Sequence, residues 1–131
     1  MEKNRPFIAV VDDEESVRRA LMRLLRASQM DVEAYASGEA FLASLANSRP
    51  DCVVLDLQMS GLTGRDVQRR LKAAQIHVPV IIITAHDEPT MRQQCIADGA
   101  AMYLRKPLRG ATLIRSIQTA IENATAPVSD S

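Results

Sequence analysis

Five short aliphatic segments alternate along this chain with five segments in which apolar residues recur at helical spacing. Aliphatic runs of this length, bounded by polar or turn-forming residues, are typical of buried strands. The predicted strands are Phe7–Val11, Val32–Ala36, Cys52–Leu55, Val78–Ile83 and Ala101–Leu104. Strands that alternate with helices through short loops favour a parallel sheet covered by helices on both faces. The hydrophobic pattern therefore indicates an α/β domain.

The topology and the helix ends can also be predicted. Right-handed crossovers leave few arrangements for five such units, and we expect a flavodoxin-like, doubly wound parallel sheet of order 2-1-3-4-5 with five helices. The first helix is expected over Glu14–Ala27. Ser37 and Asp87 are predicted N-caps of the second and fourth helices, and Gly99 is expected to end the fourth.

Polar side chains follow four of the predicted strands, at the carboxyl end of each. They are Asp12 and Asp13 after the first strand, Asp56 after the third, Thr84 after the fourth, and Lys106-Pro107 after the fifth. In open α/β sheets ligands bind at this edge, and the order 2-1-3-4-5 places the switch point between strands one and three. A single strand-end aspartate is usually a helix cap or a solvated residue. The whole set at one edge instead predicts a functional site.

The residue types at this edge point to phosphoryl chemistry. Three neighbouring carboxylates repel one another unless a cation holds them, and oxygen ligands favour Mg²⁺. Asp56 is expected to be ionised at neutral pH and can act as a nucleophile that forms an aspartyl-phosphate. Lys106 would neutralise charge on the phosphoryl group, and Thr84 would donate a hydrogen bond to it. His86 either faces the mouth of the site or is a solvated loop histidine, and Tyr103 is expected to be a half-buried edge aromatic.

Composition narrows the function further. The 16 basic and 16 acidic residues give a formal net charge of zero, which argues against direct binding of nucleic acid or of a membrane surface. No apolar run is long enough to cross a bilayer, and the start of the chain is not typical of a secretory signal. The two cysteines, Cys52 and Cys95, are expected to be buried thiols in a reducing cytoplasm. We expect one domain over residues 1–123 and a flexible tail or linker stub over 124–131.

Together these residues resemble a response-regulator receiver domain of two-component signalling, over about Arg5 to Asn123. The matching positions are Asp12-Asp13, Asp56, Met59 and Gly64 in the following turn, Thr84-Ala85, Tyr103 and Lys106-Pro107. The segments around Arg18–Leu25 and Gly61–Leu71 are most similar to the FixJ-type regulators. One position departs from the pattern, because many receivers have a proline where this chain has Ser60.

The resemblance implies a role for each residue of the site. Asp13, Asp56 and the backbone carbonyl of Gln58 would bind Mg²⁺, with Asp12 acting directly or through water. Asp56 would accept a phosphoryl group from a sensor histidine kinase. Thr84 would then move towards the phosphoryl group and Tyr103 would turn into the vacated space. Ala85, His86 and Pro107 would flank the site.

The resemblance also implies an output. Phosphorylation would alter the surface formed by the fourth helix, the fifth strand and the fifth helix, and this surface is a possible homodimer interface. The peptide bond between Lys106 and Pro107 is expected to be cis. The chain would be a switch rather than a turnover enzyme, standing alone or forming the N-terminal half of a DNA-binding transcriptional regulator.

One alternative comes from a different class of protein. A Mg²⁺-dependent phosphohydrolase would use the same aspartyl-phosphate intermediate. Such enzymes usually carry a second acid two residues after the nucleophile to activate water. Here that residue is Gln58, an amide, which disfavours the enzyme.

Overall fold

A computed structural model of the chain describes residues 5–125. Its five strands form one parallel sheet of order β2-β1-β3-β4-β5, as predicted. Along the chain the elements are β1 (Phe7–Val11), α1 (Glu15–Ala27), β2 (Asp31–Tyr35), α2 (Gly38–Ser44), β3 (Cys52–Asp56), α3 (Gly64–Ala73), β4 (Val80–Thr84), α4 (Pro89–Ala97), β5 (Met102–Arg105) and α5 (Gly110–Thr125).

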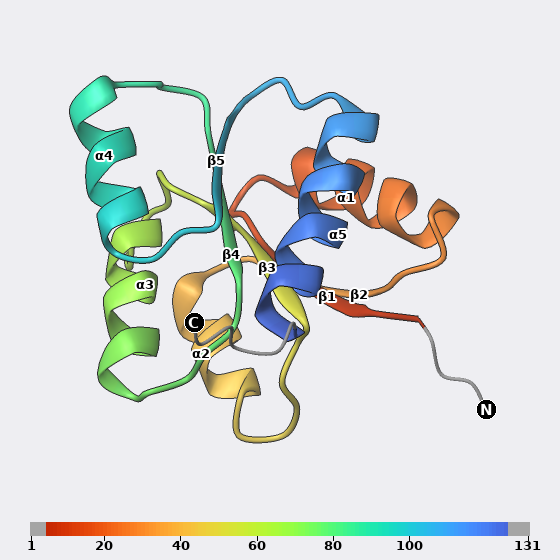
Figure 1. Cartoon of the computed structure of the whole chain (residues 1–131), viewed down its shortest axis with the longest axis horizontal. Coiled ribbons are helices and arrows are strands. Elements are labelled where there is room, and N and C mark those ends of the chain that lie inside the picture. The colour runs from red at the N-terminus through yellow and green to blue at the C-terminus, as the bar shows by residue number, and fades with distance from the viewer. Residues whose placement is uncertain (1–4, 126–131) are drawn as a thin grey trace, which may run out of the picture.

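The helices cover both faces of the sheet, with α1 and α5 on one side and α2, α3 and α4 on the other (Figure 1). Alternate residues of each central strand therefore enter different cores. Val54 of β3 packs in the core beneath α1 and α5, whereas Val53 and Leu55 pack in the core beneath α2 and α3. Every residue of β3 and of β4 is buried. Because each buried aliphatic side chain contributes about 1.5–3 kcal/mol, the central strands are anchored from both faces.

The element boundaries differ from the predicted ones by one or two residues. β4 begins at Val80 rather than Val78, and the carbonyl of Pro79, which has no N–H of its own, accepts a hydrogen bond from the Val53 N–H at 3.0 Å. β5 is shifted by one residue towards the C-terminus, and β2 by one towards the N-terminus. α5 continues to Thr125, beyond the expected domain boundary at residue 123. The rest of the predicted tail, residues 126–131, lies outside the described residues.

The predicted helix caps were right at Ser37 and wrong at Asp87. The Ser37 hydroxyl accepts a hydrogen bond from the Ala40 N–H at 3.0 Å and caps α2. The N-cap of α4 is instead Glu88, which makes no side-chain capping hydrogen bond. The Asp87 carboxylate lies 3.5 Å from the guanidinium of Arg92 and forms an ion pair with it. An aspartate before a helix can serve either role, and here the nearby arginine determines which.

The first turn of α3 is pressed against the end of β3. Thr63 and Asp66 form a capping box, in which each side chain accepts a hydrogen bond from the other residue's backbone N–H. The Gly64 N–H donates to the Leu57 carbonyl at 3.0 Å. A Cβ atom at Gly64 would lie 2.6 Å from the carbonyl oxygen of Asp56 and 2.9 Å from the Cα of Leu57. Only glycine allows this approach, and the approach positions the loop that follows Asp56.

We predict that Gly64→Ala lowers the free energy of unfolding by about 1–3 kcal/mol, because the new methyl group would collide with backbone that cannot rotate away. Urea unfolding measures the change. Gly110→Ala is the matched control, since its Cβ would meet only the end of the Leu24 side chain, at 3.1 Å. Equal effects of the two substitutions would contradict a special role of the α3–β3 contact.

Candidate functional site

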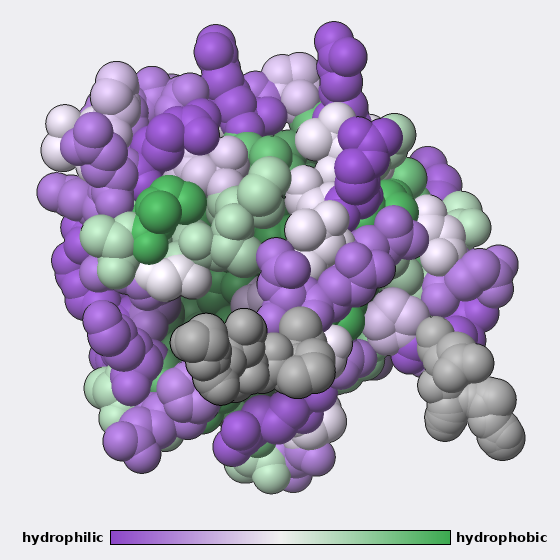
Figure 2. Space-filling view, viewed as in Figure 1, coloured by the Kyte–Doolittle hydropathy of each residue, from purple (hydrophilic) through white to green (hydrophobic). Residues whose placement is uncertain are grey.

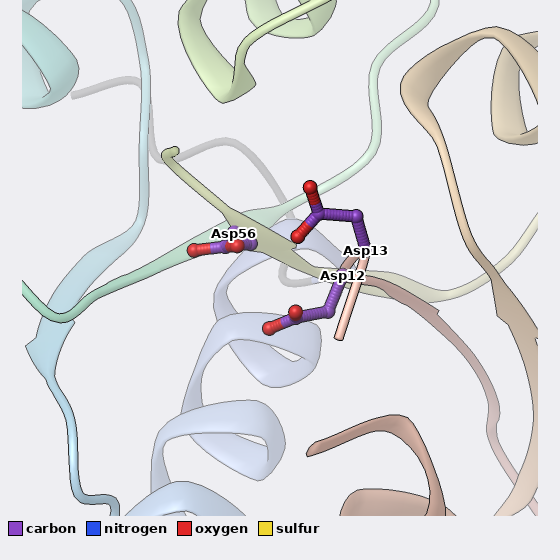
Figure 3. A group of neighbouring side chains, drawn as sticks. All are labelled: Asp12, Asp13 and Asp56. Atoms are coloured by element: carbon purple, nitrogen blue, oxygen red, sulfur yellow. The ribbon is translucent and has the colours of Figure 1, made fainter. Parts of the chain in front are cut away.

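Three carboxylates converge at the carboxyl edge of the sheet. Asp12 and Asp13 follow β1, and Asp56 is the last residue of β3, the neighbouring strand (Figure 3). One carboxylate oxygen from each residue lies within 4.8 Å of the others. Asp12 and Asp56 are buried, and Asp13 is exposed. The structure thus brings together the three acids that the sequence placed at this edge.

Asp12 is held on both of its oxygens. Oδ1 accepts a hydrogen bond from the Glu14 N–H at 2.9 Å, just before α1 begins. Oδ2 accepts one from the ammonium group of Lys106 at 3.0 Å. The Arg18 guanidinium donates to the backbone carbonyl of Asp12 at 2.7 Å. Sequence reasoning had given no site role to Arg18, although its position one turn into the helix after the acidic pair is a usable signal.

Lys106 reaches the site from the loop after β5. Its Nζ lies 3.0 Å from Asp12 Oδ2 and 3.5 Å from Asp56 Oδ1. Its backbone N–H donates to the Thr84 carbonyl at 2.7 Å, which ties the ends of β4 and β5 together. The Lys106-Pro107 peptide bond is cis, as expected. Burial alone would lower the pKa of Lys106, but the hydrogen bond to Asp12 and the charges of Asp56 and Asp12 together raise it.

Asp56 lies in a setting that opposes its ionisation. Burial is the largest cause, the negative charge of Asp12 is the next, and Lys106 acts against both. Together these effects raise the pKa of Asp56 from 3.8 to about 6. The carboxylate is therefore still ionised at pH 7 and above, as a nucleophile must be, but its charge is held at a cost in free energy.

Thr84 is fully buried at the end of β4, and its hydroxyl has partners that the sequence did not predict. Its hydroxyl oxygen lies 2.9 Å from the amide oxygen of Gln58 and 3.0 Å from the carbonyl oxygen of His86. It also accepts a hydrogen bond from the His86 N–H at 3.0 Å. His86 itself is exposed, so it contacts Thr84 through its backbone. The sequence analysis gave the receiver site only the backbone carbonyl of Gln58 and did not predict this side-chain contact.

The loop after Asp56 contacts the acidic pair through Ser60. The Ser60 N–H donates to Asp13 Oδ2 at 3.2 Å. A proline at this position could not make that bond, because proline has no backbone N–H. The departure noted in the sequence therefore has a structural consequence, a direct link between this loop and Asp13. Met59, one residue earlier, is buried in the core beneath α2 and α3.

Tyr103 is more deeply buried than expected. Although β5 is an edge strand, α4 covers this side of it and leaves Tyr103 only 4% exposed. The Arg92 guanidinium lies 4.7 Å from the centre of the ring, at a distance typical of a cation–π contact. Burial is the main cause that raises the pKa of the Tyr103 hydroxyl. Within residues 5–125 that hydroxyl has no hydrogen-bond partner. The ring thus lies inward, between β4 and α4.

The acidic cluster fits a divalent cation that prefers oxygen ligands. Asp12, Asp13 and Asp56 each direct an oxygen into one small volume, and a single lysine balances only part of their charge. A hard cation such as Mg²⁺ or Ca²⁺ takes carboxylate and carbonyl oxygens. Within residues 5–125, these three residues therefore form a group that could hold a metal ion.

Comparison with known proteins now places the chain. The model of the response regulator receiver domain family matches residues 8–118. The chain therefore belongs to the response regulator receiver domain family. Members of this family are signalling domains of two-component systems. The doubly wound fold and the resemblance predicted from the sequence are both confirmed.

Relatives and solved structures agree with this assignment. Nodulation protein W of Bradyrhizobium diazoefficiens is 35% identical over 118 residues, which cover 90% of this chain and 52% of the relative. Transcriptional regulatory protein FixJ of Rhizobium meliloti is 33% identical over 123 residues, covering 94% and 60%. The crystal structure of FixJ-N superposes with a TM-score of 0.85 at 32% identity, over 97% of this chain and 100% of that one. The crystal structure of a response regulator receiver protein from Burkholderia phymatum superposes with a TM-score of 0.79 at 46% identity, over 95% of this chain and 100% of that one.

Two further facts bear on the whole protein. The chain spans a little over half the length of these two relatives, 52% of one and 60% of the other. In the described part of the chain, every helix is too short or too polar to cross a membrane. The comparisons support a receiver domain and give no support to the phosphohydrolase alternative.

The raised pKa of Asp56 predicts a stabilising substitution. Because the pKa in the folded protein, about 6, lies above the ordinary 3.8, ionisation of Asp56 opposes folding. That cost is fully present above pH 6 and disappears as the pH falls towards 3.8. In the presence of a chelator, Asp56→Asn should be more stable than the wild type at pH 8 by about 1–2 kcal/mol. The difference should narrow as the pH is lowered to 4, and urea unfolding at both values measures it. An Asn variant no more stable than the wild type at pH 8 would contradict the assignment.

Proposed function

We propose that this domain accepts a phosphoryl group on Asp56 and changes conformation in response. The observation that carries the proposal is the placement of the Lys106 ammonium 3.0 Å from Asp12 and 3.5 Å from Asp56, beside a cluster of three acids. Asp56 closes a strand buried on both faces, so its carboxylate is held rigidly. A nucleophile and a fixed positive charge therefore face the same point at the rim of the sheet.

Each residue has a defined part in the proposed transfer. The phosphoryl donor is a phosphohistidine of the partner kinase. One carboxylate oxygen of Asp56 attacks the phosphorus atom and forms an O–P bond. The bond between phosphorus and the histidine nitrogen breaks, and its electron pair leaves with the imidazole. Lys106 stabilises negative charge on the phosphoryl oxygens, and the Thr84 hydroxyl donates to one of them. The transfer needs no general base, because Asp56 is ionised at neutral pH.

The metal completes the charge balance. Mg²⁺ would be held by Asp13, Asp56 and the backbone carbonyl of Gln58, with Asp12 acting directly or through water. When bound, it supplies positive charge that offsets the carboxylates and the phosphoryl oxygens. The three carboxylate oxygens within 4.8 Å of one another support the carboxylate part of this assignment.

The proposed partner is a sensor histidine kinase in the cytoplasm. The family supplies the two-component setting, and the two cysteines are free and buried, as suits a reducing compartment. We assign the receiver to residues 1–123 and extend it to Thr125, because α5 continues to that residue. The chain acts as a switch without turnover and without nucleic-acid contact of its own. The relatives named as transcriptional regulators support an output in transcription.

Labelling with a small phosphoramidate and Mg²⁺ tests the proposed chemistry. Intact-mass measurement should show one phosphoryl group on the wild type and none on Asp56→Asn. Asp51→Asn is the matched control: this residue lies just before the same strand, at its opposite end, and an amide oxygen can still accept the hydrogen bond from the Phe7 N–H. A chelator or Asp13→Ala should strongly reduce labelling. Stable labelling of Asp56→Asn would refute the assignment.

We also propose that the surface of α4, β5 and α5 is the output face and a homodimer interface. Two large apolar side chains there are exposed within residues 5–125, Ile96 by 47% and Met102 by 37%. Figure 2 shows apolar surface between α4 and β5, bordered by hydrophilic residues. A phosphoryl group adds about 1.5–2 negative charges at the site. Thr84 ends β4 beside the site, and Tyr103 lies on the neighbouring strand β5, which is part of this face.

Light scattering in solution tests the interface. With beryllofluoride as a phosphoryl mimic and Mg²⁺, the molar mass should rise from monomer towards dimer, because the apolar patch is then covered. Ile96→Glu should prevent the rise, since a buried unpaired charge is costly. Ala43→Glu, on the exposed side of α2, is the control and should dimerise normally. An unchanged mass of the wild type would contradict the homodimer, and an equal loss of dimer in both variants would contradict its placement on this face.

A further inference from the structure

The single proton of the Thr84 hydroxyl is already engaged in a hydrogen bond. A hydroxyl donates a single hydrogen bond. In this structure its acceptors are the amide oxygen of Gln58 at 2.9 Å and the carbonyl oxygen of His86 at 3.0 Å. The His86 N–H donates to the same hydroxyl oxygen at 3.0 Å. Thr84 is fully buried, so water does not compete for this proton.

The two acceptors differ in what they connect. His86 lies two residues after Thr84, and its contacts form a local turn at the end of β4. Gln58 is 26 residues away in sequence and lies two residues after Asp56, in the loop that follows the phosphoacceptor strand. The side chain of Gln58 therefore joins the phosphoacceptor loop to the hydroxyl of the neighbouring strand.

The same hydroxyl has a second use in the proposed function. There Thr84 donates its proton to an oxygen of the phosphoryl group on Asp56. Since one proton cannot serve both acceptors fully, the Gln58 amide oxygen and the phosphoryl oxygen compete for it. Gln58 is exposed, and together with Asp13, Ser60 and Met91 it lines a surface pocket of about 530 Å³. The amide has room to move when the hydroxyl leaves.

We propose that the side chain of Gln58 is a positioning residue that holds the Thr84 hydroxyl and so weakens the affinity of the site for a phosphoryl group. The proposal rests on the proposed function and adds a residue that regulates it. Gln58 contributes through its amide oxygen and not through charge. Its backbone carbonyl, the proposed metal ligand, is a separate group and is retained in any side-chain substitution.

The decisive experiment measures the affinity of the Mg²⁺-loaded protein for beryllofluoride. Gln58→Met keeps the length of the side chain and removes the acceptor. It should bind beryllofluoride about fivefold more tightly than the wild type, the size expected for one neutral hydrogen bond. In a Thr84→Ser background the hydroxyl remains, and Gln58→Met should again tighten binding. In a Thr84→Val background the hydroxyl is absent, and Gln58→Met should change nothing.

The results separate this proposal from the function on which it rests. Equal affinities of the wild type and Gln58→Met, or the same gain in the Thr84→Val background, would overturn the positioning role while leaving the receiver function intact. If the wild type binds no beryllofluoride, the proposed phosphoryl site itself fails. A double-mutant cycle of Gln58→Met and Thr84→Val in urea unfolding then still tests the contact between the two side chains. Additive changes in the free energy of unfolding would overturn the contact, and non-additive changes would support it.

Discussion

The mutual repulsion of three carboxylates is the constraint on which the rest of this structure depends. Asp12, Asp13 and Asp56 hold oxygens within 4.8 Å of one another, and Lys106 is the ammonium group that lies against two of them. One lysine cannot neutralise three acids, so the site keeps an excess of negative charge. That excess attracts a cation, and it also raises the pKa of Asp56, where burial is the larger cause. A site built this way gives up folding stability in exchange for chemistry.

The aliphatic core is what keeps the acids together against this repulsion. β3 and β4 are buried on both faces, and α3 is fastened to the end of β3 by the close approach at Gly64. The carboxylates therefore cannot move apart without disturbing packed strands. The packing of the sheet offsets the repulsion between the carboxylates. It also fixes where Asp56 and Thr84 lie relative to each other.

α4 is held differently from the central strands. Cys95 is its one buried residue, whereas Ile96 is exposed. Polar contacts fasten it to α3: the Arg65 guanidinium lies 2.9 Å from both Asp98 and Gln94, and the Gln68 amide donates to the Cys95 carbonyl at 3.2 Å. Elements with few buried apolar contacts move at lower cost in free energy. The looser helix therefore lies on the face proposed as output, and the rigid strands lie at the site.

The strand order, the two-sided burial of β3 and β4, and the edge at which the acids, Thr84 and Lys106 meet were all predictable from the amino-acid sequence. The burial and the position of the site follow from hydrophobic periodicity and from the end of each strand, which are local properties of the chain. The strand order follows from the handedness of the crossovers between parallel strands. The partner of each side chain, in contrast, depends on how the elements pack against one another. Asp87 pairs with Arg92 instead of capping α4, Tyr103 lies beneath α4, and the Thr84 hydroxyl is bound by Gln58. Contacts such as Lys106 to Asp12 join residues 94 positions apart, and side-chain rotamers at that range are set by packing, which no local pattern encodes.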